Sequence, residues 1–432
     1  VIRDGKVAWA KGYGVLQAGK PDKVNTETMF SVGSVSKVAA ASVSLRLVDA
    51  GKIELDRNVN QYLTRWKVPE NELTAVSPVT LRGLLSHTAG TSVKGFKDYQ
   101  PNEPIPTLLD TLEGRAPAKN VPVRVELLPG TKHSYSGGGV TVEQLLIEEV
   151  SGVAFKQAAS KYLFEPLGMK RSSFESPLPA SFGNIAKAHG KEGEPRALPR
   201  GYETLPETAA SGLWSTPSDY AKLIIALIDS YRGKAGSFLS PALAHQMMSE
   251  VGVARHGLGP VLKGSGAERV FFHDGSNDSY KAHMQGHLGT GNGVVIFTNG
   301  ANGSSLYWEA LRSVAAAEGW PEDLSSYRQA QPFPLPTAEL QQFAGIYQLQ
   351  SGASSYRHRG REKLLQVSYQ NGQLSFDDRE LVPIDANHFV FPDFERGTIE
   401  FVRGYDGRIE TLIVQYSDGG GWGGTQEFKK VR

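Results

Sequence analysis

The spacing of apolar residues along this 432-residue chain predicts a mostly helical central region between two stretches of strand character. Near the start, residues 3–6 (R-D-G-K) give a hairpin signal, and residues 6–13 alternate between apolar and polar as a strand does. The later stretches of strand character are residues 269–273, 280–286 and 293–298. Because strands lie on both sides of the helices, we expect one sheet built from both ends of this region.

Four long helices are predicted between or beside these strands. The first follows Gly33 and ends near Gly51, and its apolar residues at helical spacing are Val38, Ala41, Leu45 and Val48. The second is expected at residues 141–150, and a further helix at residues 304–318 closes the region. The third begins at Thr216-Pro217, which combines a capping threonine with a proline in the first turn.

The last hundred residues show a different pattern of apolar, polar and turn-forming residues. Repeated prolines at residues 321–336 predict a linker, which we place at residues 323–337 between domains at 1–322 and 338–432. Turn residues such as Asn371-Gly372 then separate short runs of strand character, which predicts a small antiparallel barrel or sandwich. The predicted strands are residues 343–349, 364–369, 373–376, 388–391, 398–403 and 410–416.

Composition narrows the classes of function. The formal net charge is +1, which gives no general reason to expect nucleic acid or a membrane surface as a partner. No apolar run approaches the length of a membrane span, and the absence of cysteine excludes disulfides and thiolate-bound metals. H-E-x-x-H and G-x-S-x-G are both absent, and the ten histidines show no convincing metal spacing, so we expect no metal or other cofactor.

A serine and a lysine three positions apart give the first chemical signal. Ser34 and Lys37 (S-V-S-K) lie on one face of the first helix, so the lysine amine can reach the serine hydroxyl. Serine is a poor nucleophile without a neighbouring base, and a lysine serves as one where burial or nearby positive charge lowers its pKa. Ser34 also lies at the positive end of the helix, where developing negative charge is favoured.

Two further motifs follow in order: residues 135–137 (Y-S-G) and residues 273–275 (H-D-G). The supporting phrases are residues 80–90 (T-L-R-G-L-L-S-H-T-A-G), 128–130 (L-P-G), 164–169 (F-E-P-L-G-M) and 211–217 (S-G-L-W-S-T-P). From residue 1 to about residue 320 the chain therefore resembles the penicillin-recognising serine hydrolases. This family includes class C β-lactamases, D-alanyl-D-alanine carboxypeptidases, D-aminopeptidases and esterases, and its pattern is S-x-x-K, Y-x-N, then K-T-G or H-x-G.

The resemblance implies an α+β fold: a mainly antiparallel, β-lactamase-like sheet flanked by helices, with the active site between the sheet and an all-helical region. It also implies a lipocalin-like C-terminal β-barrel, for which a structural or substrate-gating role is favoured over a separate activity. Bacteria usually export members of this family. A periplasmic or extracellular location is therefore implied, although no signal peptide precedes the strand character at Val1.

By resemblance, Ser34 is the nucleophile that forms an acyl-enzyme. Lys37 and Tyr135 share the proton transfers, and the residues do not decide which of them is the general base. A phenol of ordinary pKa near 10 is a weak base, so Tyr135 needs cationic neighbours, for which Lys37 and His273 are the candidates.

The same resemblance places residues 273–276 along the cleft. The backbone N–H groups of Ser34 and Ser276 are the expected oxyanion pair, and Gly275 is expected to let the substrate backbone approach. His273 is assigned a catalytic role, and an imidazole titrates near neutral pH. Activity is therefore expected to fall on one side of pH 6–7, in a way that His273→Lys alters.

Two positions depart from the family pattern. Gly137 replaces the usual asparagine, whose amide holds the carbonyl group of the substrate side chain, so penicillin recognition is in doubt. The glycines at residues 137–139 either widen the substrate site or bring the backbone closer to the ligand, or they belong to an ordinary flexible turn. Asp274 replaces the common threonine and adds negative charge near the expected carboxylate site, unless its side chain points away. His87 and Arg82 are interpreted as structural, the latter as a local ion-pair or capping residue.

Three functions remain open, all with a small molecule or peptide as partner. The first is a serine hydrolase that cleaves a D-amino-acid amide or peptide, or a β-lactam. The second is a carboxylesterase for small acyl esters, and the third is a binding protein that keeps the fold without turnover. Specificity is expected to depend on loops such as residues 91–120 and 183–210, which carry no readable motif. The oligomeric state is not readable from the sequence.

Overall fold

The computed structural model describes residues 1–100, 102–198, 200–202, 204–252, 254–321, 332–351, 364–376, 379–391, 394–416 and 424–432. The chain forms two compact units, Val1–Glu318 and Gly319–Arg432. Most of the predicted linker, residues 322–331, lies outside the described residues. Across the described parts of the chain, no helix is both long enough and apolar enough to cross a bilayer.

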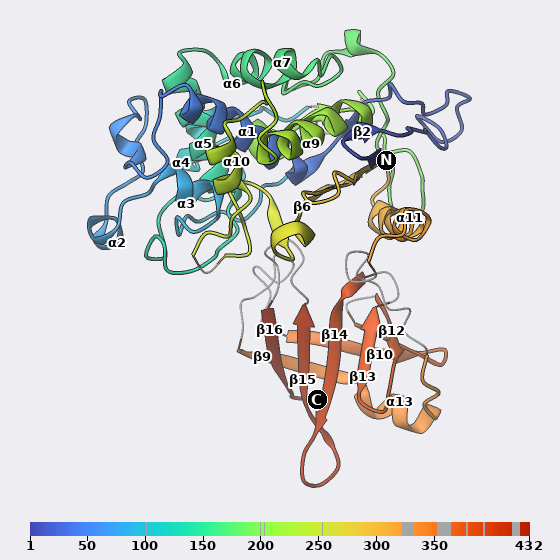
Figure 1. The fold of residues 1–432 in the computed structure, drawn as a ribbon. Coiled ribbons are helices and arrows are strands. Elements are labelled where there is room, and N and C mark those ends of the chain that lie inside the picture. Colours follow the sequence, from blue (N-terminus) through green and yellow to red (C-terminus); the bar gives the residue numbers. More distant parts are fainter. Residues whose placement is uncertain are drawn as a thin grey trace. The chain divides into compact units, whose positions relative to one another are not determined.

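The first unit is built on a six-stranded antiparallel sheet with the strand order β2-β1-β8-β7-β6-β5 (Figure 1). Its strands are β1 Ile2–Arg3, β2 Lys6–Val7, β5 Val261–Lys263, β6 Val270–Asn277, β7 Tyr280–His287 and β8 Gly293–Thr298. Both ends of the region contribute, as predicted. The strand predicted at residues 6–13 is wrong beyond Val7, because the neighbouring strand β1 offers only two residues for pairing.

Four long helices pack on or beside this sheet: α1 Ser36–Asp49, α5 Gly137–Ser151, α9 Pro217–Tyr231 and α11 Gly303–Ala317. Alternate residues of β7 face opposite sides of the sheet. On one side His283 stacks with Tyr307 of α11, and on the other Gly286 lies close to Ile224 of α9. The two helices therefore cover opposite faces.

The shorter elements of the first unit surround α1 and α5. The short helices are α2 Glu72–Val76, α3 Leu81–Leu85, α4 Leu108–Glu113, α6 Phe155–Ala159, α7 Glu165–Leu167, α8 Thr208–Ser211 and α10 Pro241–Met247. A separate two-stranded pair joins β3 Phe30–Ser31 to β4 Trp214–Ser215. Along α1, eleven of fourteen residues are buried, so this helix forms the centre of the core.

The helix ends follow the capping signals of the sequence. Thr216 accepts a hydrogen bond from Asp219 N at 3.1 Å, and Pro217 is the first residue of α9. Helix α5 ends at Gly152 as predicted but begins at Gly137, four residues before the predicted start. Arg82 pairs with Asp56 at 2.6 Å, which confirms its interpretation as an ion-pair residue.

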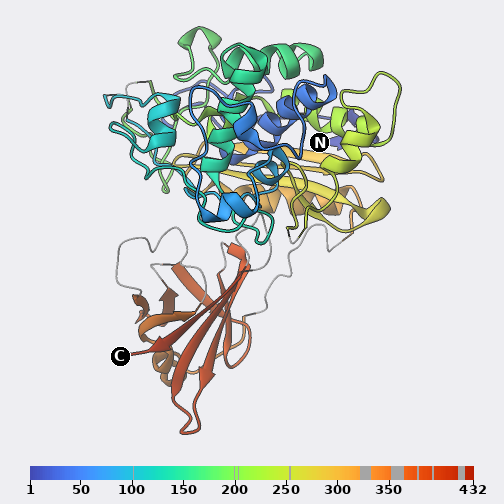
Figure 2. The same ribbon diagram turned by 90° about the vertical axis from the view of Figure 1, so that its left-hand side faces the viewer.

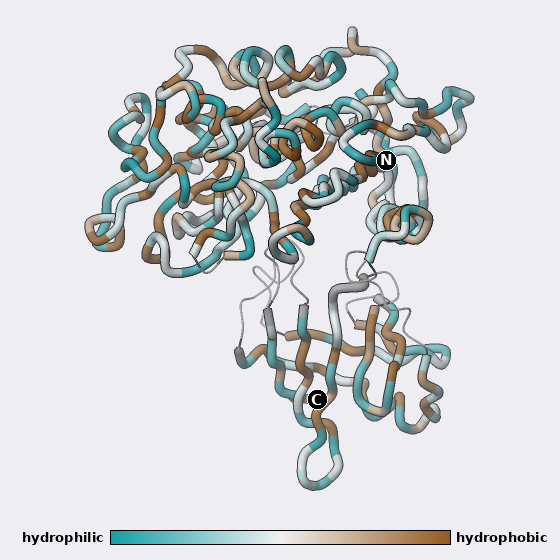
Figure 3. Tube along the Cα trace, viewed as in Figure 1, coloured by the Kyte–Doolittle hydropathy of each residue, from teal (hydrophilic) through white to brown (hydrophobic). Residues whose placement is uncertain are grey.

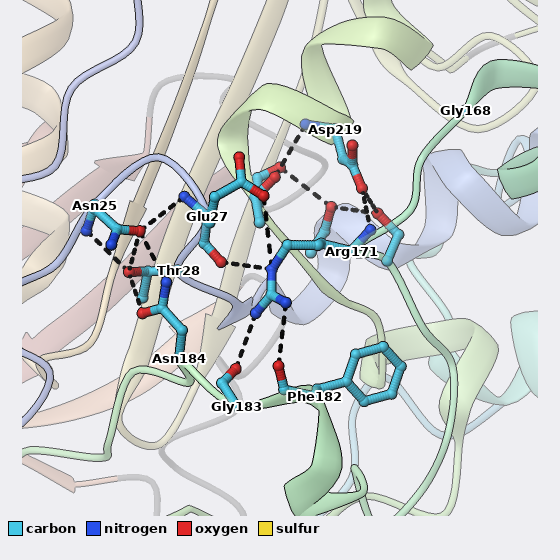
Figure 4. Close-up of polar contacts among 12 residues, drawn as sticks. Asn25, Glu27, Thr28, Gly168, Arg171, Phe182, Gly183, Asn184 and Asp219 are labelled. Atoms are coloured by element: carbon cyan, nitrogen blue, oxygen red, sulfur yellow. Dashed lines mark hydrogen bonds and ion pairs between the residues drawn. The ribbon is translucent and has the colours of Figure 1, made fainter.

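A polar network holds the segment that leads into β3 (Figure 4). The Arg171 guanidinium donates to the carbonyl oxygens of Glu27 (2.6 Å), Phe182 (3.1 Å) and Gly183 (2.9 Å). The backbone N–H of Arg171 donates to Asp219 at 2.6 Å. One side chain thus ties the approach to β3 to the loop after α7 and to the start of α9.

Arg171→Ala is expected to destabilise the first unit by about 2–3 kcal/mol, because three carbonyl groups lose a charged donor. For a unit of this size the melting temperature should fall by about 3–5 °C, measured by differential scanning calorimetry. Arg171→Lys is the matched control. It keeps the charge but not the planar fork, so an intermediate fall is expected. An unchanged melting temperature in Arg171→Ala would contradict a stabilising role for the network.

The second unit contains a closed antiparallel barrel with the strand order β10-β11-β12-β13-β14-β15-β16-β9 (Figure 2). After helix α13 Thr337–Phe343, its strands are β9 Gly345–Ser351, β10 Leu364–Gln370, β11 Gln373–Phe376, β12 Arg379–Pro383, β13 His388–Phe391, β14 Phe394–Arg403, β15 Ile409–Tyr416 and β16 Gly424–Lys430. The expected barrel is confirmed. Consecutive strands are neighbours throughout, which is the up-and-down arrangement of small closed barrels.

Apolar side chains at alternate positions fill the barrel interior, and Figure 3 shows the alternation along its strands. Pairs such as Phe389 and Phe391, or Leu412 and Val414, are buried in one core. Strands β12 and β16 were not predicted. In β16 the buried positions are Gln426 and Phe428, and the polar glutamine hides the alternation on which a prediction depends.

Candidate active site

The serine motif lies where β3 turns into α1. Ser34 is in a short 3₁₀ turn, Gly33–Val35, directly before the first residue of α1. The Lys37 Nζ donates to Ser34 Oγ at 3.0 Å and to the Ala210 carbonyl of α8 at 2.7 Å. Lys37 is only 4% exposed. The amine is therefore held in a buried position against the hydroxyl, the geometry that nucleophile activation needs.

Strand β6 packs directly against this turn. Gly33 has φ +52°, and a Cβ on it would meet the Ser276 backbone nitrogen. A Cβ on Gly275 would meet the Val32 carbonyl oxygen and come within 3.3 Å of Ser34 N. The backbone nitrogens of Ser34 and Ser276 are thus brought to the same junction, as the expected oxyanion pair requires. The space that a side chain at Gly275 would need is occupied by the protein's own turn. Packing within the protein therefore explains the glycine, whereas the expected reason was the approach of substrate.

Tyr135 lies over the lysine, and His87 holds it there. The Lys37 Nζ is 5.0 Å from the centre of the Tyr135 ring. The backbone carbonyl of His87 accepts a hydrogen bond from Ser134 N at 2.8 Å, and the Nδ1 of the His87 ring accepts one from Ser136 N at 3.2 Å. The His87 ring also packs against the Tyr135 ring in a tilted arrangement, with centres 4.3 Å apart. His87 therefore positions the tyrosine from both sides, in agreement with a structural interpretation.

His273 joins the same cluster as a neutral group. Its ring centre lies 6.2 Å from that of Tyr135, and its Nδ1 donates to the Asp274 carbonyl at 2.7 Å. Burial, followed by the charge of Lys37, lowers the pKa of His273 to about 4. The expected titration near neutral pH is therefore wrong for the free protein, and His273 is no cationic partner for a Tyr135 phenolate. With Nδ1 protonated, Nε2 is an acceptor.

A family model described as Beta-lactamase matches residues 1–317. The chain belongs to the beta-lactamase family. Members of this family are serine hydrolases, and the family and fold predicted from the sequence agree with the match.

The relatives of this beta-lactamase family member include a penicillin-binding protein and a teichoic acid D-alanine hydrolase. Penicillin-binding protein 4 of Amycolatopsis lactamdurans is 28% identical over 364 residues, which cover 79% of this chain and 90% of that protein. Teichoic acid D-alanine hydrolase of Staphylococcus aureus is 26% identical over 263 residues, which cover 59% of this chain and 58% of that protein.

Solved structures of the family share the fold. The octameric penicillin-binding protein homologue from Pyrococcus abyssi has a TM-score of 0.59 at 19% identity and covers 99% of this chain and 94% of that one. EstCE1, a hydrolase with promiscuous acyltransferase activity, has a TM-score of 0.53 at 22% identity, over 69% of this chain and 86% of that one. D-amino acid amidase from Ochrobactrum anthropi SV3 has a TM-score of 0.52 at 19% identity, over 66% and 81%.

Against the family pattern, Asp274 points away from the serine. Adjacent residues of β6 face opposite sides of the sheet, so His273 and Asp274 cannot both face the cleft. The Asp274 carboxylate pairs with His283 Nδ1 of β7 at 2.6 Å, on the side where His283 stacks with Tyr307 of α11. The negative charge of Asp274 therefore lies on the face of the sheet that α11 covers, and not beside the expected carboxylate site.

Gly137 lies at the start of α5 with the Phe96 ring beside it, and its role in substrate binding stays a prediction. It is the first residue of α5, so it is no flexible turn. A Cβ on it would lie 2.9 Å from Cε2 of Phe96, so the position is filled by another side chain and is not widened.

Two more histidines, which the motifs did not identify, complete the cluster around Tyr135. His256 is 1% exposed, and its ring centre lies 4.8 Å from that of His133 and 5.1 Å from that of His87. Neither ring nitrogen of His256 has a hydrogen-bond partner among the described residues. Burial lowers the pKa of both His87 and His256 well below the ordinary value.

Within the described residues, no group of three or more His, Cys, Asp or Glu is arranged to hold a metal ion.

This buried cluster predicts acid sensitivity. A folded-state pKa below the unfolded value of about 6.5 means that the unfolded chain binds protons first as the pH falls. The contribution of the buried, neutral histidines to the free energy of unfolding is complete above about pH 7. It declines between about pH 6.5 and pH 4 and is fully lost below pH 4. For His273 alone the free energy of unfolding should fall by about 2 kcal/mol at pH 5.

Urea denaturation of the wild type and His273→Gln at pH 8 and pH 5 measures this effect. The difference between the two pH values should be smaller in the variant by about 2 kcal/mol. The pH 8 pair is the control for any packing defect that the substitution introduces. Equal pH dependence in both proteins would contradict a neutral, buried His273.

Two buried acids were also missed by sequence reasoning. Ser44 Oγ of α1 donates a hydrogen bond to Glu143 Oε1 of α5 at 2.7 Å, and Glu207 lies at the start of α8. Burial raises the pKa of each to about 8, and the charge of Lys37 acts on both in the opposite direction. Glu143 falls inside the predicted helix, but the sequence offers no sign that its face of the helix packs against α1.

Proposed function

We propose that this protein is a serine hydrolase that forms an acyl-enzyme on Ser34 and cleaves a D-amino-acid amide or peptide bond, or a β-lactam. The observation that carries the proposal is the 3.0 Å contact between Lys37 Nζ and Ser34 Oγ, buried beneath the Tyr135 ring. The relatives named as a penicillin-binding protein and a D-alanine hydrolase support this choice of bond.

In the proposed reaction Ser34 Oγ attacks the carbonyl carbon, and its proton passes to the Lys37 and Tyr135 pair. The backbone N–H groups of Ser34 and Ser276 stabilise the oxyanion, and such donors are worth about 3–4 kcal/mol each in other enzymes. The proton then reaches the leaving group, and water attacks the acyl-enzyme with the same groups in reverse order. His273 Nε2 is a neutral acceptor, so it can accept a hydrogen bond from the Tyr135 hydroxyl or from a donor on the substrate.

A carboxylesterase is the second candidate, and the Gly137 position favours it. The amide that holds a β-lactam or peptide side chain in the family pattern is missing here, and Phe96 occupies its place. Small acyl esters need no such amide. A solved structure of the same fold carries the description of a promiscuous acyl-transferring hydrolase.

A parallel turnover assay with nitrocefin, a D-alanyl-D-alanine peptide, D-amino-acid anilides and p-nitrophenyl esters tests the proposal. A fluorophosphonate probe provides a readout that does not depend on the substrate. Labelling of Ser34 with turnover of an amide or β-lactam supports the first candidate, and turnover of esters alone supports the second. An absence of labelling under all conditions would instead favour the binding protein. We also propose an exported bacterial location and a structural or substrate-gating role for the lipocalin-like barrel, on the family resemblance.

A further inference from the structure

The first turn of α5 is shaped by a neighbouring chain segment, residues 91–96. A Cβ on Gly138 would lie 2.6 Å from the Ser92 carbonyl oxygen, and one on Gly139 would lie 2.7 Å from Thr91 Oγ1. These distances are shorter than van der Waals contact, so the three glycines at residues 137–139 allow the segment to lie directly on the helix. At Gly137 the neighbour is the ring of Phe96.

The backbone direction shows on which side Phe96 lies. Ser136 is extended, with φ −139° and ψ 112°, so residues 135 and 137 project to the same side and residue 136 to the other. The Ser136 hydroxyl points away and donates to the Ser92 carbonyl at 2.7 Å, whereas Tyr135 faces Lys37. The Phe96 ring therefore fills the position next to Gly137 on the side of the cleft that Tyr135 faces.

Contacts at both ends hold the loop that carries Phe96. On one side the Lys94 carbonyl accepts from Gly137 N at 3.3 Å. On the other, Tyr99 N donates to the Thr204 carbonyl at 3.0 Å, and Asp98 accepts from Asp278 N, in the turn after β6, at 3.3 Å. The loop thus spans from the tyrosine motif to the end of the strand that bears His273, and Phe96 is fixed within two residues of an anchor on each side.

We propose that Phe96 selects the acyl side chain of the substrate, and that the preferred acyl donors carry an aromatic or branched apolar side chain. An aromatic ring offers apolar area and edge or face contacts and cannot pair with an amide. It stands where the family pattern has the asparagine that binds a polar side chain. This inference rests on the proposed acyl-enzyme at Ser34.

The ratio of kcat/KM for p-nitrophenyl phenylacetate to that for p-nitrophenyl acetate tests the inference, because only the first acyl group carries a ring. Phe96→Ala should lower this ratio about tenfold, and Phe96→Leu should lower it less. Tyr13→Ala, which removes a ring that is 68% exposed, is the control and should leave the ratio as in the wild type. An unchanged ratio in Phe96→Ala, with Ser34 still labelled by the fluorophosphonate, overturns the inference alone.

A double-mutant cycle tests the packing without any substrate. Gly137→Asn alone should lower the melting temperature, because its Cβ meets the Phe96 ring, whereas in Phe96→Ala/Gly137→Asn the asparagine has room and the loss should be largely recovered. Additive losses would overturn the placement of Phe96. If the wild type shows neither labelling nor turnover of either ester, the proposed function fails and the inference fails with it.

Discussion

Ser34→Ala is expected to lower kcat by about 10⁴- to 10⁶-fold on whichever substrate the wild type turns over, because no other group can form the acyl-enzyme. The variant should fold normally, since the removed hydroxyl contacts only the Lys37 amine among the described hydrogen bonds. The measurements are steady-state turnover and the mass of the fluorophosphonate-treated protein, which should show no adduct.

Ser42→Ala provides the matched control for this prediction. Ser42 is buried in the same helix, and its hydroxyl donates within the helix to the Val38 carbonyl at 2.7 Å. Its loss should leave turnover and labelling near wild-type values. Residual labelling of Ser34→Ala at the wild-type rate would show that another residue is the nucleophile.

Lys37→Met is expected to lower kcat by about 10²- to 10⁴-fold, the usual contribution of a positioned acid–base group. Methionine has nearly the same length and fits a buried apolar position, so folding should be retained. The Lys37 amine has two contacts to lose, the Ser34 hydroxyl and the Ala210 carbonyl. A burst experiment should show that acylation, rather than binding, is slowed.

Two variants make the lysine prediction specific. Lys37→Arg keeps the positive charge, but a guanidinium does not release its proton, so activity should remain low. Lys52→Met removes an exposed lysine just beyond the same helix and should leave kcat unchanged. If Lys37→Arg were as active as the wild type, charge alone would suffice, and Tyr135 would be the better candidate for the general base.

Local patterns predicted the elements that depend on a few neighbouring residues. The start of α9 follows from Thr216 and Pro217, the ends of α1 and α5 follow from Gly51 and Gly152, and most barrel strands follow from alternation. Prediction failed where a distant partner decides the outcome. Residues 8–13 alternate but find no neighbouring strand, and β16 carries a buried Gln426 whose environment is supplied by other strands.

The candidate site shows the same division. The order of the motifs identified Ser34, Lys37, Tyr135 and His273 as candidates, and the structure places all four in one cluster. Order along the chain says nothing about what surrounds a side chain. The neutral state of His273 and the cluster formed by His87 and His256 come from burial by segments that are far apart in the sequence.

By itself, the sequence determined the family, the candidate serine and lysine, and the change from a unit of the beta-lactamase family to a barrel, because these depend on local spacing and residue type. Only the tertiary structure decided what each departure from the family pattern means. Asp274 faces His283 and not the cleft, and Gly137 makes room for Phe96. The physical reason is that side-chain direction, burial and close contact are set by which segments pack together, and the local sequence does not encode that choice.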